Sequence, residues 1–412
     1  MAVNCRFFHP VIININTMKK FKFFIPAIIA FFILSASVYA QSGYTFTDVK
    51  RLPATSVKDQ YRSGTCWSFS GISFFESELL RMGKGEYDLS EMFPVRVCYG
   101  VKAEKYARMN GTINFGGGGA FNDVTMTFSD FGIVPEEVYS GLNYGEDKHV
   151  HGESDGVFKA FMDAVIKNQN KELTTAWLPA FQGILDAYFG KYPESFSYKG
   201  KTYSPKSFAS ELGLDMDNYV MITSFSHHEF YKPFILEVPD NWGWGEVYNV
   251  KVDELTQIID YAIENDFTVG WACDVSEKGF SWKNGLAVVP SEEISALDGL
   301  ERAKWDELSP REKSDFFYDF SKIRKEKEIT QELRQNAFNN LTTTDDHGMH
   351  ITGIAKDQNG TKYYIVKNSW NVDGNSYKGY LHASEAFVKY KTTSLILHKD
   401  SVPKELRKKL GI

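Results

Sequence analysis

Apolar residues recur with helical spacing directly after Cys66. Phe69, Ile72 and Leu79 fall on one face of a 3.6-residue repeat. This pattern predicts a long amphipathic helix that begins at Cys66 and ends near Gly83, where glycine marks the stop.

The rest of the chain divides by the same criterion into helix-like and strand-like segments. Residues 41–60 are expected to form an extended lead-in, and Ser90 is expected to cap a second helix. A helix-like run follows the glycines at 116–119 and ends near Phe131. Further helices are predicted within 156–168, 252–265 and 309–327, and strands at 219–222, 268–272 and 363–367.

The composition indicates a large globular protein. Of the 412 residues, 43% are hydrophobic and 15% are aromatic, which is enough for a core and too apolar for disorder. The net charge of −7 argues against nucleic acid as a partner, because binding it normally requires a concentrated basic face. The basic run at 404–409 is expected to be a solvated helix end.

The first forty residues have the pattern of an export signal. A basic segment at 18–22 precedes an apolar stretch at 23–36 and a small-residue cleavage site at 38–40. Residues 1–17 are interpreted as an upstream extension, with translation starting at Met18. A membrane anchor is the alternative, but the apolar stretch is short for a span and contains Pro26. We therefore expect an exported protein, periplasmic or extracellular, with no membrane attachment after cleavage.

Of the cysteines in the chain, only Cys66 is a candidate for a catalytic thiol. Cys5 would be lost with the leader, so Cys66, Cys98 and Cys273 remain. Cys98 and Cys273 could form a bridge, but nothing in the sequence places them together, and we interpret both as small buried apolar residues.

The segment from Gln60 to Ser70 carries the strongest chemical signal. Cys66 follows a glycine-containing turn and heads the predicted helix, whose N-terminus offers partial positive charge and free N–H groups that favour a thiolate. The side-chain amide of Gln60 could donate a hydrogen bond to an oxyanion formed beside the sulfur.

A second chemical cluster lies near the C-terminus. His347 and His350 begin a strand-like run, and Asn368-Ser369-Trp370 follows the strand predicted at 363–367. Side chains alternate along a strand, so the two histidines should point to opposite faces.

These segments together resemble papain-like cysteine peptidases, through Gln60, Cys66-Trp67, Phe69, His347 and Asn368-Ser369-Trp370. Ser63 stands where that family's local signature has its first cysteine, so the usual disulfide is absent. This departure makes the chain similar to the bleomycin hydrolase and aminopeptidase C branch along most of its length. The resemblance implies His347 as the general base, Asn368 as the residue that orients it and Trp370 as a shield for their hydrogen bond, while His350 should contact the surface or neighbouring structure.

The resemblance also implies an α+β, papain-like two-lobe fold, in which a helical lobe headed by Cys66 faces a β-barrel-like lobe across a cleft. Gly118 and Gly119 would line the acyl side of this cleft, where no Cβ blocks the substrate backbone. The base usually lies roughly 130–150 residues after the cysteine, and His347 lies nearly twice as far, which indicates a large mixed insertion. The expected division is 1–40 for the signal, 41–150 for the lead-in and helical lobe, 151–340 for the inserted subdomain, and 341–412 for the β-rich lobe and tail.

The implied reaction is peptide hydrolysis without a cofactor. The Cys66 thiolate, stabilised by the His347 imidazolium, attacks the carbonyl carbon, and His347 then protonates the leaving amine. His347 later deprotonates the water that hydrolyses the thioester. Gln60 and the Cys66 N–H would hold the tetrahedral oxyanion.

The branch implies an aminopeptidase that releases N-terminal residues, with the chain's own C-terminus in the cleft, and a homo-hexamer. The sequence given ends at Ile412 without the long Pro- and Trp-containing ending of many relatives, so an endopeptidase remains open. A non-catalytic peptide-binding protein and a thiol acyltransferase are the alternatives from other classes.

His227 and His228 are the remaining candidates for metal ligands. Adjacent histidines on a strand or loop are expected to point apart, and no cysteine or histidine partner stands at a useful spacing. No metal site is therefore predicted.

Overall fold

The structure is a computed structural model that describes residues 43–293, 297 and 299–412, all of them in one compact unit. The predicted export signal at 1–40 lies outside the described residues. Among the residues that are described, no helix is long and apolar enough to cross a membrane.

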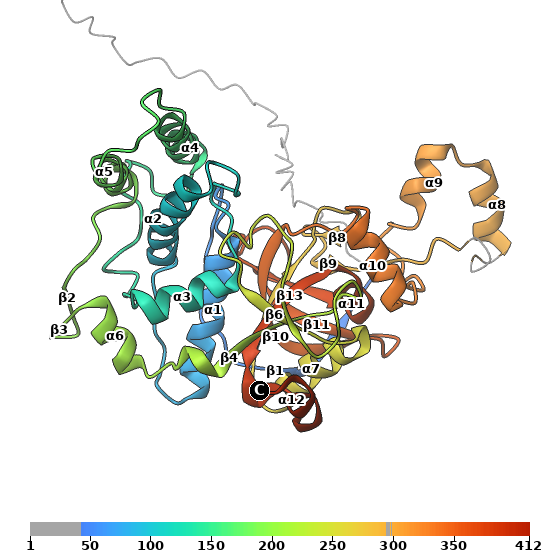
Figure 1. The fold of residues 1–412 in the computed structure, drawn as a ribbon. Coiled ribbons are helices and arrows are strands. Elements are labelled where there is room, and N and C mark those ends of the chain that lie inside the picture. The colour runs from blue at the N-terminus through green and yellow to red at the C-terminus, as the bar shows by residue number, and fades with distance from the viewer. Residues whose placement is uncertain (1–42, 294–296, 298) are drawn as a thin grey trace, which may run out of the picture. The chain divides into compact units, whose positions relative to one another are not determined.

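One large mixed sheet, a separate two-stranded sheet and a set of helices make up the fold (Figure 1). The strands are β1 (Phe46–Arg51), β2 (Phe196–Tyr198), β3 (Lys201–Tyr203), β4 (Tyr219–Thr223), β5 (Pro233–Ile235), β6 (Glu246–Asn249), β7 (Val269–Cys273), β8 (Phe280–Ser281), β9 (Leu286–Ala287), β10 (His347–Asp357), β11 (Lys362–Lys367), β12 (Tyr380–Ser384) and β13 (Thr392–His398). The helices are α1 (Cys66–Arg81), α2 (Met92–Arg108), α3 (Phe121–Asp130), α4 (Gly152–Ile166), α5 (Trp177–Phe189), α6 (Pro205–Leu212), α7 (Val252–Glu264), α8 (Gly299–Glu307), α9 (Pro310–Phe316), α10 (Gln331–Asn339), α11 (Glu385–Lys391) and α12 (Lys404–Leu410), with short 3-10 turns at Met216–Asn218 and Lys399–Ser401.

The two-stranded sheet is formed by β2 and β3. The large sheet has the strand order β5-β6-β4-β13-β7-β10-β11-β12-β9-β8, and β1 pairs with the far half of β10. The first half of β10 pairs with β7, so that His347 lies opposite Cys273. The antiparallel partner β11 places Lys367 opposite His350. In an antiparallel pair, the start of one strand lies beside the end of the other. His347 begins β10 and Asn368 directly follows β11, so both residues lie at the same end of this strand pair.

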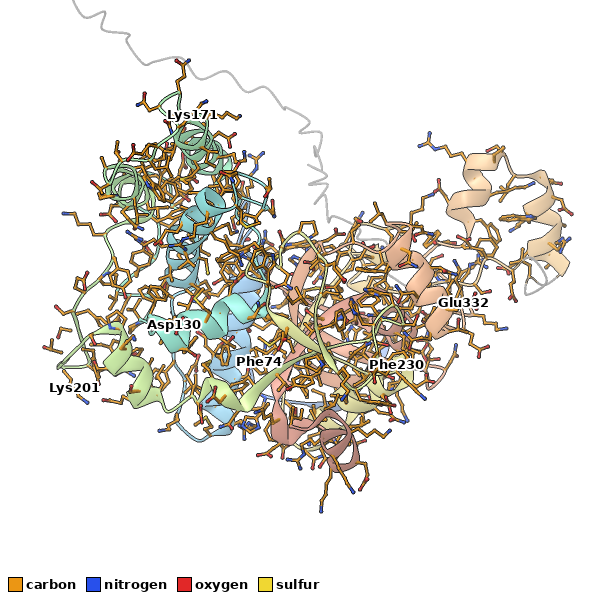
Figure 2. All side chains as sticks on the ribbon, in the orientation of Figure 1. Phe74, Asp130, Lys171, Lys201, Phe230 and Glu332 are labelled. Atoms are coloured by element: carbon orange, nitrogen blue, oxygen red, sulfur yellow. The ribbon has the colours of Figure 1, made fainter. Side chains whose placement is uncertain are left out.

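Helix α1 is the structural link between the helices and the sheet. Every residue from Trp67 to Leu79 is buried, because α1 packs against α2 and α3 on one side and against β7 and β10 on the other. Phe74, labelled in Figure 2, is completely buried in this layer. The expected amphipathic character is therefore wrong for α1, since both of its faces meet protein, although its predicted start and end agree with the structure.

Two hydrophobic cores lie on either side of this junction. One gathers apolar side chains of α1–α6, and the other gathers those of α7, α11, α12 and the central strands. Cys98 and Cys273 are both free and buried, one in each core, which confirms their interpretation as small apolar residues.

Residues 151–340 contribute to both parts. Helices α4 and α5 pack on each other and on α2, while β4 and β7 lie at the centre of the large sheet on either side of β13. The helix predicted across 309–327 is shorter than expected, since α9 ends at Phe316, and α5, α6, α8 and α10 were not predicted.

Candidate active site

A cavity at the junction of α1 and β10 contains the main candidate residues. Its lining includes Cys66, Gly119 and His347 together with the carboxylates of Asp240 and Asp345. The sulfur at the start of one element and the imidazole at the start of another therefore face the same enclosed space, although they are far apart in the sequence.

Cys66 begins α1 and its side chain is partly buried. Burial raises the pKa of the Cys66 thiol to about 12, and the carboxylates of Asp240 and Asp345 act in the same direction. The backbone N–H groups of Gly348 and Trp67 favour the thiolate but are outweighed. The N–H group at the start of the helix thus acts in the predicted direction, but desolvation is the larger effect.

The His347 ring is fixed on two sides. Its Nε2 donates to Oδ1 of Asn368 at 2.7 Å, and the same oxygen accepts from the backbone N–H of Ser369 at 2.7 Å. The ring of Trp370 lies against the imidazole, with centroids 4.6 Å apart. Asn368 thus occupies Nε2 of the ring, and burial lowers the pKa of His347 to about 4.

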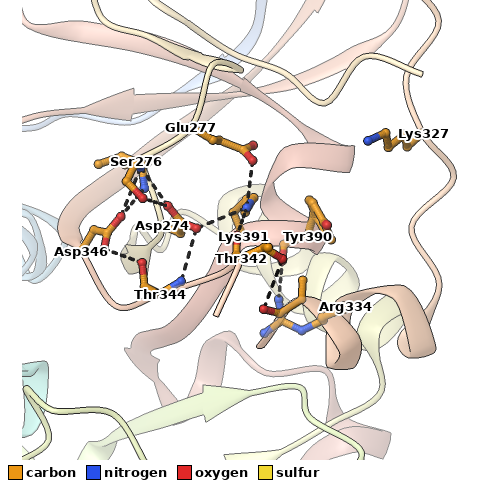
Figure 3. A network of polar contacts seen from close by, with 12 residues as sticks. Asp274, Ser276, Glu277, Lys327, Arg334, Thr342, Thr344, Asp346, Tyr390 and Lys391 are labelled. Carbon is orange, nitrogen blue, oxygen red and sulfur yellow. Dashed lines mark hydrogen bonds and ion pairs between the residues drawn. The ribbon is translucent and has the colours of Figure 1, made fainter. Parts of the chain in front are cut away.

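The loop that precedes His347 is held in place by a network of polar contacts (Figure 3). Asp346 accepts hydrogen bonds from the backbone N–H of Ser276 at 3.1 Å and from Oγ1 of Thr344 at 2.7 Å. The buried ammonium of Lys391 pairs with Asp274 at 3.2 Å and donates to the carbonyl of Thr342 at 2.6 Å. These contacts bracket residues 342–346, so the position of His347 does not depend on β10 alone.

Gln60 lies beside Asn368 through Ser369. The Ser369 hydroxyl donates to Oε1 of Gln60 at 2.5 Å, and the Gln60 backbone N–H donates to the Ser369 carbonyl at 2.9 Å. Nε2 of Gln60 donates to the carbonyl of Ser63 at 2.9 Å, which uses one of its two N–H groups. Gln60 is not among the residues that line the cavity, and only its second N–H could serve an oxyanion.

The glycine-rich segment at 116–119 forms one wall. The buried ammonium of Lys102 donates to the carbonyls of Gly116 at 2.9 Å and Gly118 at 2.6 Å. Of the two predicted glycines, Gly119 lines the cavity and Gly118 is not among the lining residues. A Cβ on Gly118 would meet the Asp240 carboxylate at 2.3 Å, so only glycine lets this wall and Asp240 approach.

Asp240 and Asp345 are among the acidic residues that line the cavity. Asp240 accepts from Nδ2 of Asn114 at 2.8 Å, and Asp345 accepts from Oγ1 of Thr393 at 3.0 Å. Burial raises the pKa of both carboxyls, that of Asp345 to about 7. No spacing in the sequence pointed to these residues, because they come from loops that meet only in the folded chain.

His350 lies away from this cavity. It is completely buried against α1, where its Nδ1 contacts Oγ of Ser73 at 2.9 Å, and the ammonium of Lys367 donates to the same hydroxyl at 2.8 Å. Burial and the nearby Lys367 charge hold its pKa well below the usual range. The two histidines thus point to different environments, as the strand alternation predicts.

Sequence reasoning missed three further residues that shape the site. Ser369 connects Gln60 to the Asn368 side of the cleft, and it stood in a motif whose other members were assigned roles. Gly348 allows close packing, because a Cβ there would lie 2.6 Å from Oγ of Ser70 and 3.3 Å from the Cys66 carbonyl oxygen. Lys102 lies in the largely buried helix α2, where a buried lysine indicates a specific partner.

His227 and His228 do not point apart, so that prediction is wrong. Both Nε2 atoms contact the Glu237 carboxylate, at 3.0 Å and 2.8 Å. The two residues lie in a turn after β4 rather than on a strand, and the alternation of strand side chains does not apply there.

The chain was compared with known protein families, curated proteins and solved structures. The Peptidase C1-like family matches residues 314–411, a segment that contains both His347 and Asn368. No curated protein sequence matches the chain. PepW from Lactobacillus rhamnosis is 16% identical, with 90% of this chain and 85% of that chain covered and a TM-score of 0.66. A bromelain protease from Ananas comosus with a bound inhibitor is 13% identical, with 84% of this chain and 94% of that chain covered and a TM-score of 0.36.

The fold is therefore α+β and papain-like, which confirms the predicted fold class. The family match supports a cysteine-type peptidase that acts on peptides, and it covers the segment from which the candidate base and its orienting amide come.

Proposed function

We propose that the protein is an exported cysteine aminopeptidase of the bleomycin hydrolase and aminopeptidase C branch. The observation that carries the proposal is the shared cavity of Cys66 and His347, with Asn368 bound to the far ring nitrogen of the base.

The reaction would start from a neutral thiol and a neutral imidazole. Burial disfavours each charge alone, but transfer of the thiol proton to Nδ1 of His347 creates both charges together, and they stabilise each other. The thiolate then forms a bond to the peptide carbonyl carbon. As the carbon–nitrogen bond breaks, His347 returns the proton to the leaving amine.

The second half of the cycle would use water. His347 accepts a proton from the water that attacks the thioester carbonyl, and the carbon–sulfur bond breaks to regenerate the thiol. Asn368 keeps the ring in one orientation through both transfers, and the Trp370 ring restricts access of solvent to that hydrogen bond.

Asp240 supports the preference for a free N-terminus. It lines the cavity next to Gly118, on the side assigned by resemblance to the acyl part of the substrate, where an aminopeptidase must hold the substrate ammonium. We propose that this internal carboxylate receives the ammonium. None of the described residues 404–412 lines the cavity, and Ile412 packs against the core of the β-rich part.

The position of residues 404–412 also favours a second candidate, an endopeptidase, since none of these described residues lines the cavity. Paired fluorogenic substrates test the choice: an aminoacyl amide with a free amine and its N-acetyl counterpart. We expect hydrolysis of the free-amine substrate to dominate and to be lost in Cys66→Ser. Efficient cleavage of the blocked substrate, or internal cuts in a long peptide, would favour the endopeptidase.

A substitution of Asp240 tests its proposed role in binding the substrate amine. Asp240→Asn should lower kcat/KM for the free-amine substrate by roughly 10- to 100-fold, the value of a charge-assisted hydrogen bond, and leave the N-acetyl substrate almost unchanged. Asp217→Asn, an exposed carboxylate outside the cavity, is the matched control. Equal losses on both substrates would assign Asp240 to the architecture of the cavity rather than to the amine.

A further inference from the structure

Two histidines and a glutamate form a compact group on the edge of the β-rich part. The possible ligand atoms of His227, His228 and Glu237 all lie within 4.8 Å of one another, and this is the only such group among the described residues. The histidines come from the loop after β4, which also carries Phe230 in Figure 2, and Glu237 comes from the segment after β5.

The spacing of these atoms suits a metal ion. Each Nε2 lies 2.8–3.0 Å from a different oxygen of the Glu237 carboxylate. Ligands on a tetrahedral Zn²⁺ with bonds of about 2.0–2.2 Å lie roughly 3.3–3.6 Å apart. Each of the two nitrogen–oxygen pairs therefore has to open by only about half an ångström to admit an ion, and all the ligand atoms already lie within 4.8 Å of one another.

The loop that carries the histidines is fixed before any ion binds. The buried Asn249 side chain donates from Nδ2 to the carbonyls of Phe225 at 2.7 Å and His228 at 3.1 Å, and its Oδ1 accepts from the Phe225 N–H at 2.9 Å. The two imidazoles also lie on aromatic rings, His227 on Phe338 and His228 on Phe234. Little conformational entropy remains to be lost on binding.

Gln335 of α10 supplies an outer contact of the kind that metal-bound histidines use. The amide of Gln335 lies close to Nδ1 of His227: its nitrogen Nε2 is 3.1 Å away and its oxygen Oε1 is 3.3 Å away. Without an ion, Nδ1 of His227 can accept a hydrogen bond from the Gln335 amide while its Nε2–H donates to Glu237. With an ion, Nε2 of His227 becomes the ligand, and its Nδ1–H donates to Oε1 of Gln335. The His227 tautomer thus changes while Nδ1 keeps its Gln335 partner.

We propose that His227, His228 and Glu237 form a binding site for Zn²⁺ or a similar divalent transition metal ion. Two imidazoles and one carboxylate are borderline ligands that suit this class. The side chains are 29%, 37% and 56% exposed, so an ion can enter and water can complete the coordination.

The site adjoins the wall of the catalytic cavity. Leu236 and Val238, the two neighbours of Glu237, both line that cavity, as does Asp240. Metal binding would fix this wall, and the site itself stands independently of the proposed peptidase activity.

The test is a count of bound Zn²⁺ in the full chain with Cys66→Ser, which removes the active-site thiol as a competing ligand. Equilibrium dialysis against micromolar Zn²⁺, followed by metal analysis, compares this protein with versions that also carry His228→Ala or Glu237→Gln. His398→Ala, a partly buried histidine on β13, is the matched control. Thermal unfolding with and without Zn²⁺ is recorded for each.

We expect both site variants to bind one equivalent less than the parent and the control, and to lose the Zn²⁺-dependent rise in Tm. Their Tm in the presence of a chelator should remain close to that of the parent, which shows that they fold. Equal stoichiometry in all four proteins, or no Zn²⁺ bound by the parent, would overturn the proposal and leave a hydrogen-bonded His–Glu–His cluster.

Discussion

At the scale of single residues, the chemistry of Cys66 depends on its partner. Burial holds the pKa of the thiol at about 12, and the N–H groups at the start of α1 do not compensate. In the proposed mechanism a proton leaves the sulfur at neutral pH only when His347 accepts it, because we expect the ion pair to have a stability that the isolated thiolate lacks.

Alkylation of Cys66 by iodoacetamide in His347→Ala tests this dependence. Without its partner, Cys66 should react slowly at neutral pH, and the rate should rise about tenfold per pH unit without a plateau, since only the thiolate is nucleophilic. Wild type and His398→Ala should react faster at neutral pH. The rate is followed by mass spectrometry of the Cys66 peptide, and a plateau near neutral pH in His347→Ala would contradict the raised pKa.

Several residues acquire their environment from distant parts of the chain. Ser369 meets Gln60 across more than three hundred residues, and Asp240 approaches Gly118 only because the loop after β5 folds over the glycine-rich segment. The sequence could name Cys66, Gln60, His347 and Asn368 as candidates from local motifs. Their catalytic roles stay predictions, and the groups that surround them could not be found from spacing.

At the scale of elements, the contact between α1 and β10 brings the two halves of the site together. The contact depends on a residue without a side chain, because a Cβ on Gly348 would lie 2.6 Å from Oγ of Ser70. Ser70 in turn donates to the Cys66 carbonyl at 2.7 Å and supports the first turn of α1.

Gly348→Ala should therefore damage stability and activity together. We expect a cost of roughly 1–3 kcal/mol in the free energy of unfolding, typical of overpacking, and a lower kcat/KM because β10 must shift away from Cys66. Gly183→Ala is the matched control. This glycine lies on α5 with open space around its Cα. Alanine at this position should therefore raise the free energy of unfolding by about 0.5–1 kcal/mol, because alanine has the higher helix propensity. Urea unfolding measures the stability of both variants, and substrate assays measure their kcat/KM. If Gly348→Ala leaves both quantities unchanged, α1 and β10 tolerate more separation than expected.

The elements were predictable where a local period was strong. The start and end of α1 and the positions of α7, β4, β7 and β11 followed from apolar spacing. The burial of both faces of α1 did not, since its pattern cannot reveal that a sheet covers the side that would otherwise meet solvent.

At the scale of the whole molecule, buried carboxyls tie the stability of the fold to pH. Glu326 joins distant segments, because its Oε2 accepts from the Val289 N–H at 2.9 Å and from the Ser384 hydroxyl at 2.6 Å. Burial is the main reason that the pKa of Glu326 rises to about 7 from its ordinary 4.5. The folded state holds this proton more tightly than the unfolded chain, so the resulting stability is complete below about pH 4.5 and is lost as the pH rises through 7.

Glu326→Gln should remove this dependence, since the amide oxygen can accept both hydrogen bonds without a charge. Relative to wild type, the variant should gain stability between pH 5 and 8, by at most about 3 kcal/mol. Glu328→Gln, exposed and two residues away, is the matched control. Urea unfolding at both pH values measures the difference, and a constant gap between wild type and Glu326→Gln would contradict the raised pKa.

The sequence by itself determined which reactive groups the chain carries, their order, the helix that begins at Cys66 and the α+β class, because these depend on neighbours within a few turns or on a local motif. Only the tertiary structure decided that burial raises the pKa of the thiol and lowers that of the imidazole, that carboxyl groups from separate loops line the same cavity, and that His227 and His228 converge on Glu237. Desolvation and long-range proximity arise when distant segments pack, and no local pattern of residues encodes them.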